Sequence, residues 1–227
     1  MVKTRDHFER WFSERSGPRK PKDEASLLAA ADAFDSIQKR RKVTPQLLEP
    51  IVAACAWPPT SLSANASRFL SILANQYVEA GHAVEMMASD GRWQVRFNAV
   101  LCARKEAPVD LNVKILRIAL RDKSARVRGM AACHAGILEI QELICDLEQA
   151  LKCEKDPKAK DSIDFELKLL RDGFTVEPAS KGQFVVCTRF NRGTTSRFVS
   201  KAELDRLGPK AIAKKMRKEH DRLFPPR

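Results

Sequence analysis

The sequence predicts a mainly α-helical protein with a small three-stranded β meander and further helices at its C-terminal end. The 227-residue chain contains only nine glycines and 7% aromatic residues, too few for a β-sandwich or barrel with glycine-rich turns and aromatic strands. Apolar residues recur at helical spacing up to Gly173, and β-branched and aromatic residues follow it. We therefore expect an N-terminal helix and linker (1–24), a helical repeat domain (25–173) and a basic module of β meander plus helices (174–227).

The first 80 residues read as helices separated by turns. Apolar spacing predicts helices over 4–15, 25–41, 45–56 and 61–79. Prolines, a glycine and mixed charges over 16–24 predict an exposed linker. Thr44 is expected to cap a helix that has Pro45 at its first position. Gly81 is expected to separate the helix over 61–79 from the next one.

An internal repeat with a shift of 32 residues is the strongest pattern in the chain, and it runs over residues 82–172. Each repeat reads as an amphipathic helix, a polar turn with an acid, and a second helix with a base six residues after the acid. The aligned acids are Asp90, Asp122 and Glu154, and the aligned bases are Arg96, Arg128 and Lys160. The acid can cap backbone N–H groups of the second helix, and the base can reach an acid of its own or of the adjacent repeat. We assign this ladder of acids and bases to structure.

The D-x5-R spacing of Asp90/Arg96 and Asp122/Arg128, with the V-R-x-x-A pattern of VRFNA and VRGMA, resembles HEAT repeats. The resemblance implies an armadillo-type α-α superhelix, an α-solenoid of antiparallel helix pairs with a concave groove. HEAT-repeat proteins mostly bind proteins or nucleic acids, and only a few are enzymes.

A second resemblance is to the HEAT-like bacterial alkylpurine DNA glycosylases, which are basic helical proteins of similar length. These enzymes hold a damaged nucleotide with aromatic residues and an acid. In this sequence Asp90 and Trp93 match that pairing, with Arg92 and Arg96 beside them. The resemblance implies, as an alternative function, excision of alkylated purines from DNA.

After Gly173 the pattern predicts three antiparallel strands followed by two helices. The strands are expected over 174–178, 183–190 and 194–199, with turns at 179–182 and 191–193. Ser200 is expected to cap a short helix over 201–207, with Glu203 at a position typical of a capping box. Gly208 ends that helix, and Pro209 opens a last helix over 209–223.

The net charge of +12 is concentrated in the C-terminal module, which contains 13 Lys and Arg and five Asp and Glu. Residues 25–173 carry a net charge of only +2. Such an excess predicts a surface that binds a polyanion by releasing its counterions. The alternative is a solvated amphipathic helix that is merely basic. The residues that we expect to contact a partner are Arg92, Trp93, Arg126, Arg189, Arg192, Lys214, Lys215, Arg217 and Lys218.

Several common classes of protein are excluded by missing patterns. The six cysteines form no CxxC pair, the four histidines form no ligand motif, and GxxxxGK[ST], GxGxxG and GxSxG are absent, so we expect neither metal nor cofactor. The polar N-terminus and the lack of a long apolar run predict a cytoplasmic protein without a membrane role. We expect a non-enzymatic scaffold that binds a protein or a nucleic acid.

Overall fold

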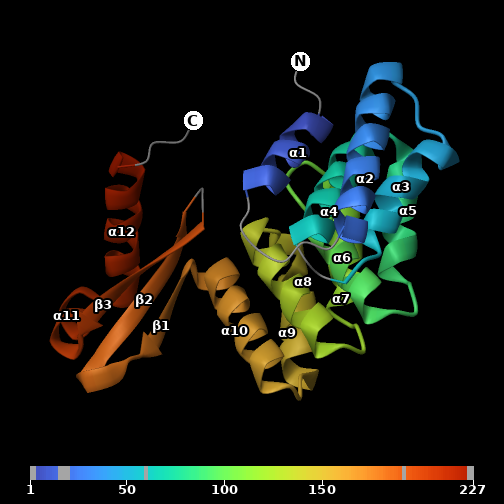
Figure 1. Ribbon diagram of the computed structural model, residues 1–227. Helices are drawn as coiled ribbons and strands as arrows, with labels where there is room; N and C mark the ends of the chain where they lie inside the picture. Colours follow the sequence, from blue (N-terminus) through green and yellow to red (C-terminus); the bar gives the residue numbers. More distant parts are fainter. Residues whose placement is uncertain (1–3, 15–20, 59–60, 191–192, 224–227) are drawn as a thin grey trace. The chain divides into compact units, whose positions relative to one another are not determined.

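A computed structural model of the chain describes residues 4–14, 21–58, 61–190 and 193–223. Within these ranges lie twelve α-helices, two short 3-10 helices and one three-stranded sheet (Figure 1), so the prediction of a mainly helical protein is confirmed. The chain divides into two compact units at His134/Ala135, inside the helix α8 (Ala125–Ile137). This division falls within the segment predicted as one repeat domain, and the predicted domain boundaries stay a prediction.

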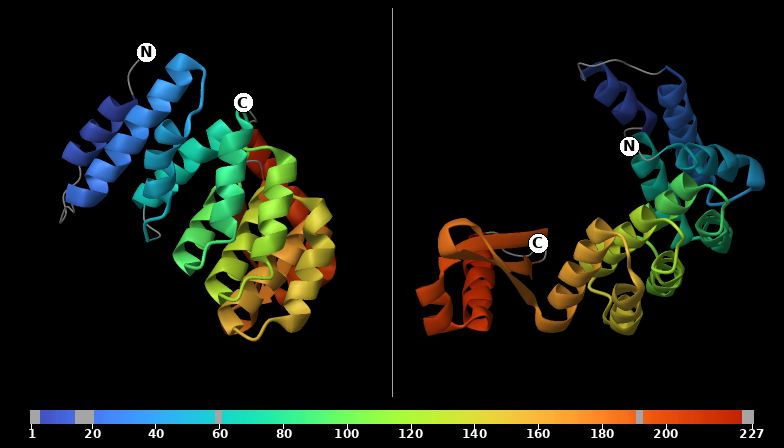
Figure 2. Two further views of the ribbon diagram at one scale, coloured as in Figure 1. Left: turned by 90° about the vertical axis from the view of Figure 1, so that its right-hand side faces the viewer. Right: turned by 90° about the horizontal axis from the view of Figure 1, so that it is seen from below.

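The first unit is a series of helices in which each one, from α1 to α7, contacts the next. Further contacts join α2 to α4, α4 to α6 and α5 to α7, so helices that are not consecutive also pack together, as the left view of Figure 2 shows. Its elements before α8 are α1 (Thr4–Glu14), α2 (Pro21–Arg40), α3 (Pro45–Cys55), α4 (Ser61–Ala74), α5 (Val78–Ala88), α6 (Trp93–Leu101) and α7 (Val109–Ala119).

Two helix boundaries differ from the predicted ones. The predicted helix over 61–79 is wrong, because α4 ends at Ala74 and Tyr77 adopts an extended backbone before α5 begins. Gly81 lies inside α5 and does not separate two helices; a Cβ at this position would lie 3.9 Å from Leu111 Cδ2 of α7, an ordinary contact. The helix α2 already begins at Pro21, where a missing N–H costs nothing, so the predicted linker is too long, and residues 15–20 lie outside the described part. The Thr44 cap of α3 is confirmed, with the hydroxyl accepting from the Leu47 N–H at 3.4 Å.

Short polar side chains fill the contact between α4 and α6. Ser63, Ser67 and Ser71, one helical turn apart, are fully buried. The Ser71 hydroxyl donates to the carbonyl of Cys102 at 2.7 Å, and the Ser67 hydroxyl donates to the carbonyl of Asn98 at 3.3 Å. Because serine is small and these hydroxyls find acceptors, the two helices can approach closely without leaving a buried donor unpaired.

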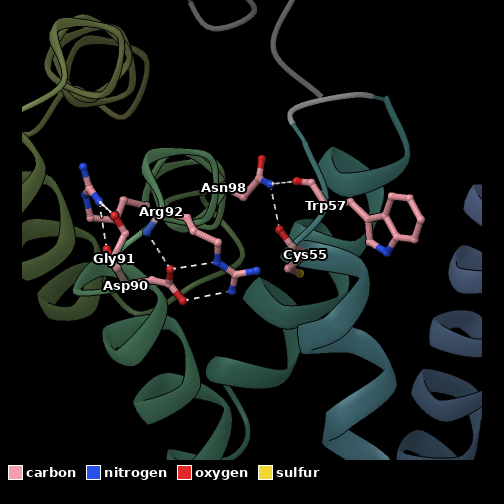
Figure 3. A network of polar contacts seen from close by, with 7 residues as sticks. Cys55, Trp57, Asp90, Gly91, Arg92 and Asn98 are labelled. Carbon is pink, nitrogen blue, oxygen red and sulfur yellow. Dashed lines mark hydrogen bonds and ion pairs between the residues drawn. The ribbon is translucent and has the colours of Figure 1, made fainter.

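Asn98 of α6 joins this helix to the end of α3. Its side-chain amide donates to the carbonyls of Cys55, at 2.7 Å, and Trp57, at 2.6 Å, as Figure 3 shows. The side chain is fully buried. A fully buried amide must be hydrogen-bonded, so this residue fixes the turn after α3 against α6.

The second unit holds two helices, the sheet and two further helices. The sheet has the strand order β1-β2-β3 with both pairs antiparallel, and Val186 pairs with Val176 on one side and Arg197 on the other. The predicted meander is therefore confirmed. After α8 the elements are η1 (Gln141–Leu143), α9 (Ile144–Cys153), α10 (Pro157–Asp172), β1 (Phe174–Pro178), η2 (Ser180–Gly182), β2 (Gln183–Phe190), β3 (Gly193–Ser200), α11 (Lys201–Leu207) and α12 (Pro209–Leu223).

The last two helices cover one face of the sheet (Figure 2, right view). Val186 and Val199 from this face form a small core with Ile212, Ala213 and Met216 of α12. The predicted cap of α11 is confirmed, because the Ser200 hydroxyl accepts from the N–H of the third helical residue at 3.1 Å. Apolar burial of α12 on one side leaves its other side to solvent.

Candidate functional site

The acids of the three repeats occupy equivalent positions. Asp90, Asp122 and Glu154 each accept a hydrogen bond from the backbone N–H two residues later, at 2.8, 2.7 and 2.9 Å. In each case that N–H belongs to the residue directly before a helix, namely α6, α8 or α10. The carboxylates therefore fix the turns into these helices and lie near their positive ends, as the spacing predicted.

The bases of the first two repeats, Arg96 and Arg128, bind the turns that hold the repeat acids. Arg96 donates from Nε and Nη2 to the two carboxylate oxygens of Asp122, at 2.6 and 2.9 Å, and from Nη1 to the carbonyls of Asp90 and Gly91. The side chains of Arg96 and Asp122 are only 7% and 6% exposed. Arg128 donates to the carbonyl of Asp122 at 2.6 Å, which is the equivalent of the Arg96 bond to Asp90. Lys160, the weakest match, is exposed.

The two repeat aspartates, Asp90 and Asp122, are held ionised by these contacts. The hydrogen bonds from Arg92 hold the pKa of Asp90 below its ordinary value of 3.8. Burial alone would raise the pKa of Asp122, but the hydrogen bonds from Arg96 and the Ser124 N–H, with the nearby positive charges, outweigh it and lower that pKa. A carboxylate in this state serves as an anchor for cations and N–H groups.

Two of the three contact residues predicted at these turns, Trp93 and Arg126, are in contact, and the third, Arg92, precedes Trp93 in the chain. Arg126 lies in the first turn of α8. Its guanidinium is 5.1 Å from the centre of the Trp93 ring, which is a cation–π contact. Trp93 itself opens α6 and makes an edge contact with Phe97. Arg92 is 63% exposed and lies beside Asp90, to which it donates two side-chain hydrogen bonds (Figure 3). We name Arg92, Trp93 and Arg126 the turn cluster.

The lysines predicted on the last helix lie on one exposed side of α12. Residues at helical spacing opposite Ile212 and Met216 form a band of positive charge that the core leaves uncovered. Within the described residues, only one cation of this band forms an ion pair: Lys215 Nζ lies 3.9 Å from a carboxylate oxygen of Glu219. We name this band the cationic stripe; its exposed members are Lys210, Lys214, Lys215, Lys218 and Arg222.

Two predicted contact residues of this module have partners within the second unit. Arg217 donates from Nε to the hydroxyl of Thr188 at 2.7 Å and from Nη2 to the carbonyl of Gly173. Arg189 is 10% exposed and pairs with Glu166 of α10, which is 9% exposed. These two guanidinium groups hold α12 and α10 to the sheet. Arg192 lies outside the described residues.

Glu166 and Arg189 were paired by tertiary packing that the sequence does not signal. Burial raises the pKa of the Glu166 carboxyl above its ordinary value of 4.5, and the positive charge of Arg189 offsets part of this rise. The pair lies directly on Gly136, where a Cβ would overlap the Glu166 carboxylate and come within 2.8 Å of Arg189 Nη2. A larger residue at this position would therefore force the buried ion pair to move.

Burial shifts the pKa of two other groups with catalytic potential, His134 and Cys55. His134 Nδ1 lies 2.8 Å from the carbonyl of Ala103, and burial lowers the pKa of this imidazole below its ordinary 6.5. All six cysteines are free thiols, and the pKa of the buried Cys55 is raised by desolvation. Among the residues that the structure describes, no cluster of three or more His, Cys, Asp or Glu could hold a metal ion.

Comparisons with known proteins give no match among protein-family models, curated proteins or solved structures, so a function must be argued from the geometry of the described residues. In the described ranges, none of the helices is both long enough and apolar enough to span a membrane. The turn cluster and the cationic stripe are thus the surfaces on which a function can be argued.

Proposed function

We propose that the protein is a non-enzymatic, HEAT-like helical scaffold that binds the backbone of a nucleic acid through the cationic stripe of α12. One observation carries this proposal. The helix buries Ile212, Ala213 and Met216 on the sheet and turns five cations outward, only one of which is paired among the described residues. Exposed cations, most of them without an acidic partner among the described residues, are what a polyanion requires.

The repeat architecture that we propose is supported by the equivalence of the three turns. Asp90, Asp122 and Glu154 bind backbone N–H groups in the same way at intervals of 32 residues. The bidentate bond from Arg96 to Asp122 links one proposed repeat to the next inside the first unit. Identical turns at a fixed interval are typical of stacked helical hairpins, in which each pair covers the apolar side of its neighbour.

The dimensions of the cationic stripe suit several phosphates. Lys210 and Arg222 are twelve residues apart on one helix, which is about 18 Å at 1.5 Å per residue. Each phosphate contact in duplex DNA changes the slope of log affinity against log salt by about −0.9. Four contacts predict roughly a 100-fold loss of affinity between about 50 mM and about 200 mM salt. Such binding is independent of the base sequence.

Fluorescence anisotropy with a labelled random-sequence DNA duplex at two salt concentrations tests the proposal. Replacing Lys210, Lys214, Lys218 and Arg222 by Gln should abolish most of the binding and flatten the salt dependence. The matched control replaces four exposed lysines elsewhere in the second unit, Lys152, Lys155, Lys158 and Lys160, by Gln. It removes the same charge and should change affinity much less. Equal losses in the two variants, or no binding at low salt, would show that the stripe is not the binding surface.

The alternative function, excision of alkylated purines, rests on the turn cluster. Trp93 and Asp90 lie at one turn, but Arg126 lies over the Trp93 ring and Arg92 holds the Asp90 carboxylate. This arrangement favours a contact surface over a catalytic pair, since both side chains already have a cationic partner. Release of 3-methyladenine or 7-methylguanine from alkylated DNA, lost in Asp90→Asn and Trp93→Ala, would establish the enzyme instead.

A further inference from the structure

The outer strand β3 leaves one edge of the sheet open. In the described part of the chain β3 pairs only with β2. The helix α12 packs against β1 and β2, α10 packs against β1, and α11 contacts β2 and β3. The α11 and α12 contacts lie on the face that carries Val186 and Val199. The helices α11 and α12 therefore cover one face of the sheet, and α10 lies at the edge formed by β1. Among the described residues, the edge formed by β3 stays open.

This edge lacks the features with which proteins usually block strand pairing. The register from Gln183↔Ser200 to Phe190↔Gly193 runs without a bulge over eight residues, and β3 contains no proline. Its single charged residue, Arg197, is paired with Glu203 at 2.9 Å. Long edges without bulge, proline or unpaired charge are templates for an additional strand.

An apolar anchor lies beside the open edge. Phe198 is 63% exposed, although it is one of the largest apolar side chains of the module. It pairs across the strands with Val185, so both side chains belong to the face opposite Val186 and Val199. Thr194 and Ser196, at alternate positions on the same face of β3, are also exposed. A bound strand would thus find backbone partners and one apolar contact.

We propose that the edge of β3 binds an extended acidic segment of a partner protein as a fourth strand. The backbone of the eight residues of β3 spans about 26 Å. Every second residue of such an edge can form backbone hydrogen bonds with an added strand. Residues 174–227 carry a net charge of +8, which disfavours pairing with a second copy and favours an acidic segment. This peptide site is separate from the nucleic-acid surface on α12.

Binding of a fluorescein-labelled octapeptide that alternates Glu with Val and Phe tests this site on the full chain. Ser196→Glu places a negative charge on the exposed edge and should weaken binding at least tenfold, and Phe198→Ser should weaken it several-fold. Ser180→Glu is the matched control, because it adds the same charge at an exposed position in η2. The same peptide with alternate backbone nitrogens methylated keeps its charge and side chains but cannot pair, so it should not bind.

Each outcome of this experiment decides the proposal. Loss of binding in Ser196→Glu and with the methylated peptide, together with unchanged affinity of Ser196→Glu for the DNA duplex, supports a strand-pairing site independent of α12. Equal binding of the two peptides would show that charge alone is responsible and would overturn the site. A dimer of the free protein in light scattering that Ser196→Glu dissociates would identify a second copy as the occupant and overturn the acidic partner.

Discussion

The guanidinium of Arg96 and the carboxylate of Asp122, 26 residues apart in the chain, form a bidentate ion pair in which both side chains are more than nine-tenths buried. The same arginine binds the carbonyls of the turn before its own helix. One side chain thus joins the turn into α6 to the turn into α8. We therefore expect this ion pair to contribute strongly to the stability of the first unit.

Removing one partner of this pair should be costly. Asp122→Leu is expected to lower the free energy of unfolding by about 3–5 kcal/mol, because Arg96 is left as a buried charge without its counter-ion. The double variant Arg96→Met/Asp122→Leu should lose much less than the sum of the single variants. Urea denaturation measures both. The exposed pair offers the control, since Arg92→Gln should cost less than about 1 kcal/mol. Additive losses in the double variant would contradict a coupled pair.

Acid should weaken the first unit through Asp122. Its pKa in the folded protein is lowered below the ordinary 3.8, so the unfolded chain takes up the proton first as the pH falls. The stabilisation is complete above the unfolded pKa and is lost as the pH drops through the folded pKa. Between about pH 5 and about pH 2, the wild-type protein should lose more unfolding free energy than Asp122→Asn. Parallel curves for the two proteins would mean that the aspartate contributes no such linkage.

Gly136 should not tolerate a larger side chain. An added Cβ would overlap Glu166 and crowd Arg189, so Gly136→Ala is expected to lower the stability of the second unit by about 1–3 kcal/mol. Thermal unfolding followed by circular dichroism measures the effect. Gly91→Ala is the matched control, because no atom lies within 4 Å of its Cβ position. A melting temperature of Gly136→Ala equal to that of this control would contradict the packing of the ion pair on Gly136.

Asn98 should be required for the turn after α3. Asn98→Ala leaves the carbonyls of Cys55 and Trp57 without their donor and opens a small cavity, at a cost of about 1–3 kcal/mol. Hydrogen exchange should show faster opening of residues 55–58 in this variant. Asn75→Ala, at an exposed position, should change neither measurement. Unaltered exchange in Asn98→Ala would mean that the turn is held by other contacts.

The sequence was most informative where neighbouring residues determine structure. The repeat shift of 32 residues located the acids whose carboxylates bind the N–H two residues later, because such a turn depends only on local spacing. The predicted boundary at Gly81 is wrong, because the break between α4 and α5 lies at Tyr77 and its neighbours. Within a helix, glycine costs only about 1 kcal/mol, which tertiary contacts readily offset.

The binding residues were harder to predict, because exposure depends on packing between distant elements. Lys214, Lys215 and Lys218 were placed on the open side of α12 by helical spacing alone. Arg189 of β2 carries the same charge, but Glu166 of α10, 23 residues earlier in the chain, pairs with it. Nothing in the local sequence distinguishes an arginine that meets solvent from one that meets a buried carboxylate.

The carbonyl of Gly173 accepts hydrogen bonds from both Thr188 of β2 and Arg217 of α12. The residue that caps α10 is therefore bound from two elements that follow it in the chain. A fragment beginning at Phe174 would lose this acceptor and the Glu166 carboxylate together, so Arg217 and Arg189 would each lose a hydrogen-bond partner that lies before the module. An autonomously folding C-terminal piece must for this reason retain α10, and a protease would be expected to leave that helix attached to the strands.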